Sequence, residues 1–188
     1  MEDIITSISS YGYIIIALYS FGGGLIALIG GAILSSIGKL DISYVILIAG
    51  ISNMFGDMFL FYIGKYQKKE LSKYPFFIKH RRKVAYSKIL IKKYDVLSVF
   101  IQKYLYGIKT IIPIIFGITN YNFVKFSLLN IFASMLWAIS VGLATFYSAN
   151  SIREFFNNSE INPIIFPLIL FGTIFLIWKF LDFKTKKK

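Results

Sequence analysis

Apolar residues occupy the chain in long runs that are broken by glycine clusters, a basic stretch and isolated polar positions. The first run is helical in pattern from Ile4 to Tyr19, ends at three glycines (22–24) and resumes over residues 25–37. Each glycine weakens a straight helix by about 1 kcal/mol relative to alanine, but glycine permits tight turns and close helix contacts. Residues 4–37 are therefore predicted to form a broken or re-entrant segment. The alternative is one helix that packs tightly through its small residues.

Later runs predict membrane helices separated by polar or basic stretches. The expected elements are a helix over residues 42–64, a basic linker over 65–93, an apolar but interrupted segment over 96–119, a helix over 123–149, a polar loop over 150–162, a last span over 163–181 and a basic tail over 182–188.

Composition agrees with a membrane protein. The 188 residues are 56% hydrophobic and 18% aromatic, with a mean hydropathy of +0.67, whereas soluble domains are about 45–50% apolar. Several runs approach the roughly 20 apolar residues that span a bilayer. We expect a single all-α polytopic membrane domain, a helical bundle.

The net charge of +12 concentrates in the linker (65–93) and the tail (182–188). Because this charge flanks apolar spans, cytoplasmic placement and attraction to anionic headgroups explain it better than nucleic-acid binding does. If the linker and the tail are both cytoplasmic, the two spans at 123–149 and 163–181 together begin and end on the cytoplasmic side of the membrane. Residues 96–119 must then cross an even number of times, which predicts a re-entrant hairpin.

A short internal repeat supports two related halves. Residues 52–58 (SNMFGDM) resemble residues 129–135 (LNIFASM), with an asparagine, a phenylalanine, a small residue and a methionine at matching places. Each repeat follows a broken apolar segment. An inverted repeat would look like this, with a site near the midplane where the broken segments meet.

Charged residues inside apolar runs mark the candidate site, because each costs about 2.5–3.5 kcal/mol at membrane depth. Asp57 is expected to respond to protons or cations; alternatively it is a helix-packing or hydrated interfacial residue. Lys103 and Lys109 are expected to hold a phosphate group together, or else to extend to the interface. Other candidates for the cavity or the hairpin are Asn53, Gly56, Gly107, Pro113 and Asn130.

Other kinds of chemistry have no support in the sequence. The chain has no cysteine, and its single histidine, His80, lies in a basic run. We find no metal-ligand cluster, catalytic triad or phosphate-binding glycine loop, so we expect no metal, no cofactor and no enzymatic activity. Trp137 is expected to face lipid or the membrane interface.

Three blocks of residues resemble the DedA family, the bacterial SNARE-associated (VTT-domain) membrane proteins. Gly56-Asp57 with Tyr62-Ile63-Gly64-Lys65 is similar to that family's GD…Y-x-G-R/K signature. The stretch from Lys103 to Gly117 is similar to its R-F-x-P-G-x-R…P…A-G block. The last block, N-x-x-G-A-x-x-W…G, is matched by Asn130, Ala133, Trp137 and Gly142. The order and spacing of the blocks cover most of residues 11–149.

The resemblance implies two re-entrant hairpins that face each other from opposite leaflets of the bacterial cytoplasmic membrane. It also implies a role in envelope homeostasis through translocation of a polyprenyl-phosphate or related lipid, coupled to protons. The chain departs from the family pattern in three ways: the first broken segment has no acid, both arginines are lysines, and Tyr106 replaces a proline. Two alternatives stay open, a proton-coupled antiporter of small ions or solutes and a non-transporting protein that organises the membrane.

Overall fold

The computed structural model describes residues 2–71, 75, 79–105 and 109–158, and every regular element among them is a helix. This agrees with the predicted all-α class. The chain divides into two compact units, Met1–Tyr147 and Ser148–Lys188. The candidate site lies wholly in the first unit. The predicted span at 163–181, the basic tail and Gly107 lie outside the described residues.

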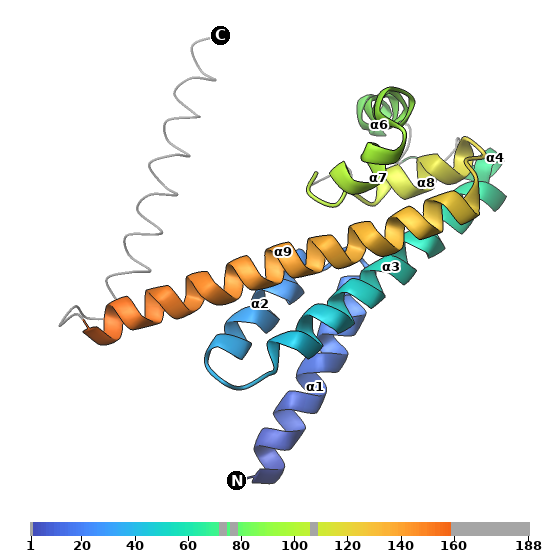
Figure 1. The fold of residues 1–188 in the computed structure, drawn as a ribbon. Coiled ribbons are helices and arrows are strands. Elements are labelled where there is room, and N and C mark those ends of the chain that lie inside the picture. Colours follow the sequence, from blue (N-terminus) through green and yellow to red (C-terminus); the bar gives the residue numbers. More distant parts are fainter. Residues whose placement is uncertain (1, 72–74, 76–78, 106–108, 159–188) are drawn as a thin grey trace. The chain divides into compact units, whose positions relative to one another are not determined.

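The first apolar run forms two helices, α1 (Glu2–Phe21) and α2 (Leu25–Ser36), joined by the three glycines (Figure 1). Gly23 has a φ of 109°, a conformation that residues with a side chain rarely adopt. The amides of Gly23 and Gly24 donate to carbonyls of the last turn of α1, at 3.1 and 3.0 Å. The glycines therefore end one helix and turn the chain into the next.

Helix α3 (Ile42–Tyr66) is central to the first unit and packs against α1, α2 and α8 (Ile111–Ile118). It begins at Asp41, whose carboxylate accepts a hydrogen bond from the Ser43 amide at 2.7 Å. Glycines on its buried face allow backbones to approach closely. A Cβ at Gly56 would overlap the Phe21 carbonyl oxygen of α1, and one at Gly64 would overlap the Ile114 carbonyl oxygen of α8.

The basic linker is largely helical where it is described. A short helix, α4 (Lys68–Leu71), is followed by α6 (Arg81–Tyr94). Leu90 of α6 is buried in the apolar core, whereas Ile89 is 61% exposed. Helix α6 thus packs one face against α7 (Val96–Ile101) and α8. Its other faces expose Arg82, Lys83, Lys88, Lys92 and Lys93.

The interrupted segment consists of two short helices, α7 and α8, with turns between them in the described part (Figure 1). At 1.5 Å per residue neither helix spans the roughly 30 Å of a hydrocarbon core. The two ends of the segment meet. Asp95, before α7, accepts hydrogen bonds from Tyr121 at 2.6 Å and from Lys125 at 2.8 Å, both after α8. We call this group of three residues the surface clasp.

Helix α9 (Phe123–Asn158) continues past Ala149, so the predicted loop is wrong for residues 150–158. This stretch contains no glycine or proline, and Arg153 and Glu154 favour helix. In the part of the chain that the structure describes, α3 and Phe123–Phe155 of α9 are long and apolar enough to cross a membrane.

Two apolar clusters lie along α3 and α9 with a polar layer between them. One contains Phe61 of α3 and Phe126 of α9, and the other contains Val45 and Ala138. Between these positions both helices carry buried polar side chains, and these form the candidate site: Asn53, Asp57, Asn130 and Ser134.

Candidate functional site

The ammonium group of Lys103 lies at the centre of the polar layer. Its Nζ donates to Asp57 Oδ2 at 2.6 Å, to Ser134 Oγ at 2.7 Å and to Asn53 Oδ1 at 2.8 Å. Lys103 is 1% exposed and Asp57 is 3% exposed. Because an ammonium group has three hydrogens, all its donors are used. We call these three oxygen-bearing residues and the ammonium they surround the Lys103 site.

Helical spacing brings the ligands of this site together. Asn53 and Asp57 are four residues apart on α3, and Asn130 and Ser134 are four apart on α9, so each pair shares a helix face. Ser134 Oγ also donates to Asn130 Oδ1 at 3.4 Å. The Asn130 amide group donates to the Met54 carbonyl at 3.0 Å, which joins the two long helices across the site.

Lys109 has a different environment. Its Nζ donates to the Gly23 carbonyl oxygen at 3.0 Å and lies 3.9 Å from the centre of the Trp137 ring, a cation–π contact. Both side chains are buried, Lys109 with 7% and Trp137 with 1% exposure. In the described part of the chain the Gly23 carbonyl is the only hydrogen-bond acceptor of this ammonium, so two of its donors are unused.

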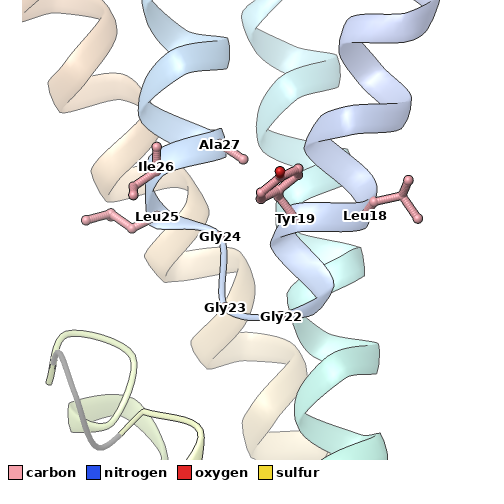
Figure 2. Close-up of a pocket in the computed structure, with 8 residues that line it drawn as sticks. All are labelled: Leu18, Tyr19, Gly22, Gly23, Gly24, Leu25, Ile26 and Ala27. Atoms are coloured by element: carbon pink, nitrogen blue, oxygen red, sulfur yellow. The ribbon is translucent and has the colours of Figure 1, made fainter.

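A pocket of about 500 Å³ opens between α1 and α2 beside the glycine turn (Figure 2). Tyr19 lies between the two helices in this view, and the N-terminal turn of α2 forms the opposite wall. Gly24 caps α2 without a side-chain hydrogen bond, and the first turn carries no acidic residue. Gly23 is common to the pocket lining and to the Lys109 contact. The full lining is Leu18, Tyr19, Gly22, Gly23, Gly24, Leu25, Ile26 and Ala27.

The surface clasp is a second charged group, well outside the buried layer. Its lysine and aspartate side chains are 46% and 55% exposed. The hydrogen bond from Lys125, then that from Tyr121, lowers the pKa of Asp95 below its usual value. The clasp holds together the two ends of the segment that carries both buried lysines.

Two further predicted site residues, Gly56 and Pro113, lie where helices pack together and are not among the hydrogen-bond partners of the Lys103 ammonium. Gly56 is buried where the end of α1 contacts α3. Pro113 is buried inside α8. The expectation that the two lysines hold one ligand together is not met in this conformation, since Lys103 is bound by Asp57, Asn53 and Ser134 and Lys109 by Gly23 and Trp137.

Sequence reasoning missed two residues of the site. Ser134 occupies the repeat position that matches Asp57, as Asn130 matches Asn53, so the repeat contained the signal that would have found it. Trp137 was expected at the lipid surface, and this is wrong: its ring is buried under Lys109. A lone tryptophan in an apolar helix gives no sign of such a contact.

The all-helical architecture, the two long apolar helices and the buried charged layer fit a helical membrane protein. Over 137 residues the chain is 28% identical to the "Inner membrane protein YohD" of Escherichia coli (strain K12), a match that covers 73% of this chain and 70% of that protein. No family model matches the chain. No solved structure matches it either.

Proposed function

We propose that this chain is a DedA-like membrane protein that moves a lipid with a phosphate headgroup, such as a polyprenyl phosphate, across the bacterial cytoplasmic membrane. The similarity to an inner membrane protein and the three sequence blocks support the location and the family. In this proposal the protein is a transporter with no catalytic residue, and its coupling group is the Asp57–Lys103 pair.

The observation that carries the proposal is the state of Lys109. A buried ammonium with one hydrogen-bond acceptor among the described residues, beside a glycine turn and a start of α2 that has no side-chain cap, is suited to bind an anion. The pocket that shares Gly23 has apolar walls from Leu18, Leu25 and Ile26, which suit the first carbons of a lipid tail. Lys109 is therefore the phosphate-binding residue of the conformation described.

Lys103 has a separate role in this proposal. Its donors are saturated by protein oxygens, so it binds no phosphate until the turn that follows α7 moves. The surface clasp joins the two ends of the stretch that contains α7 and α8, as a re-entrant hairpin requires. With this topology the linker and the C-terminal tail are cytoplasmic, and the basic face of α6 contacts anionic headgroups.

A flip assay tests the proposal. Proteoliposomes with a fluorescent short-chain polyprenyl phosphate in both leaflets are treated with a quencher that does not cross the membrane. Wild-type protein should expose the inner lipid to the quencher, and Lys109→Ala should slow this at least tenfold. Lys39→Ala, which removes an exposed lysine outside the site and the clasp, is the matched control and should keep the wild-type rate. Equal rates for wild type and Lys109→Ala would remove Lys109 from the proposal.

A further inference from the structure

We infer that the Lys103 site is a binding site for a monovalent cation, occupied in this conformation by the ammonium group of Lys103. A free monovalent metal ion, K⁺ or Na⁺, takes its place when the segment that carries Lys103 moves away. This inference rests on the geometry of the buried layer. It does not require the cargo to be a lipid.

The ligands and the occupant of the Lys103 site come from different parts of the fold. The three oxygens belong to the long helices α3 and α9, which the Asn130–Met54 hydrogen bond joins directly. The ammonium belongs to the turn that follows the six-residue helix α7. The oxygens therefore stay in place if that turn moves, and the cation leaves with it.

The buried charge of Asp57 links departure of Lys103 to the binding of another cation. Asp57 is 3% exposed, and Asn53 and Ser134 are fully buried. A buried carboxylate that loses its partner is strongly destabilised, so departure of Lys103 requires a replacement cation at the same oxygens. Movement of the turn is then linked thermodynamically to cation uptake, and the cation concentration sets how often the turn is displaced.

The last turn of α1 also lies beside the site. The Asn53 amide donates to the Ser20 carbonyl at 3.4 Å, which places the last turn of α1 beside the site. Ser20 Oγ is fully buried and has no hydrogen-bond partner among the residues that the structure describes. The C-terminal end of a helix carries partial negative charge, and broken membrane helices use such ends to coordinate cations.

The ligand set also indicates the charge of the ion. One carboxylate with neutral amide and hydroxyl oxygens balances a single positive charge, as the ammonium now does. Sites for Ca²⁺ and Mg²⁺ generally add further carboxylates or retained waters. The geometry therefore points to a monovalent rather than a divalent cation.

Thermal unfolding of Lys103→Ala in detergent tests the inference. Melting temperatures are compared in KCl, NaCl and N-methylglucamine chloride at equal ionic strength and fixed pH, because N-methylglucamine is too large to enter the site. We expect saturable stabilisation of Lys103→Ala by K⁺ or Na⁺, with a rise of roughly 5 °C, and none for wild type. The double variant Lys103→Ala/Asp57→Asn should lose the response.

Lys125→Ala is the matched control, since it leaves the exposed Asp95 without its lysine. It should show no difference between the three salts. The inference is overturned if Lys103→Ala melts at one temperature in all three salts, or if Lys125→Ala or the double variant responds equally. It is also overturned if Lys103→Ala responds to pH alone, because a proton on Asp57 would then be the replacement.

A second variant makes the test independent of how well Lys103→Ala folds. The chain has no cysteine, so Lys103→Cys can be modified with an aminoethyl thiosulfonate that restores an ammonium group. Unmodified Lys103→Cys should be stabilised by K⁺ or Na⁺, and the modified protein should lose this response. If neither variant yields folded protein in K⁺ or Na⁺, the site does not accept a free ion and the inference fails.

Discussion

Gly64 of α3 and Gly117 of α8 show how single residues determine the depth of packing in this molecule. A Cβ at Gly64 would overlap the Ile114 carbonyl oxygen, and a Cβ at Gly117 would overlap the Phe61 carbonyl oxygen. Each helix therefore contacts the other's backbone at a glycine, the means by which membrane helices pack closely. The short helix α8 is held against α3 by this contact and by apolar burial.

Gly64→Ala should destabilise the protein by about 2 kcal/mol, because the added methyl group meets rigid backbone rather than a movable side chain. Thermal unfolding in detergent measures this as a lower melting temperature. Gly30→Ala is the control, since a Cβ there meets nothing within 4 Å and alanine favours the helix α2. A melting temperature for Gly64→Ala equal to that of Gly30→Ala would show that α8 does not pack as described.

The Asp57–Lys103 pair gives a second prediction for single residues. Asp57→Asn and Lys103→Met should each destabilise the protein by about 3–5 kcal/mol, because each leaves a buried charged group without its partner. The double variant should be more stable than the sum of the two changes predicts. A double-mutant cycle measured by denaturation checks this, and additive effects would mean that the two groups are not in contact.

The long helices α3 and α9 and the break between α1 and α2 show which elements sequence reasoning could predict. The apolar run located α3 closely, and the glycines located the break between α1 and α2. The end of α9 was misplaced because polar residues were taken to end the helix, although polarity alone does not stop one. The pairing of Lys103 with Asp57 depends on which elements pack together, and that information is not local to either run.

The surface clasp carries a prediction about pH. Its lysine and tyrosine hydrogen bonds lower the pKa of Asp95, so the clasp stabilises the fold above the ordinary aspartate pKa near 4 and loses this effect as pH falls through the lowered pKa. The melting temperature of wild type should therefore fall more between pH 5 and 3 than that of Asp95→Asn. The difference should be small, because the pair is exposed. Parallel curves would show that the clasp contributes nothing.

The arrangement of the whole chain in the membrane can be tested by cysteine accessibility, because the protein has no native cysteine. Lys88→Cys and Asn122→Cys should react with an impermeant thiol reagent from the cytoplasmic side, and Ser151→Cys from the opposite side. A segment of residues 96–119 that crossed the membrane once would instead place Asn122 on the side opposite Lys88, and Ser151 on the same side as Lys88. Labelling in intact and opened cells distinguishes the two arrangements.

For the whole molecule the sequence predicted an all-α chain with spans at 42–64, 123–149 and 163–181. The structure agrees for the first two, and the third lies outside the described residues. The partners inside the polar layer were not predictable from composition or periodicity. The weak repeat was the only local sign that Asn130 and Ser134 lie opposite Asn53 and Asp57.

The surface clasp also bears on the order of folding. It closes a loop between Asp95 and Tyr121, which are 26 residues apart, and closing a flexible loop of that length costs about 3 kcal/mol in chain entropy. An exposed ion pair is screened by solvent and contributes too little to close the loop by itself. The burial of α8 against α3 must therefore come first, and the clasp forms between chain ends that packing has already brought together.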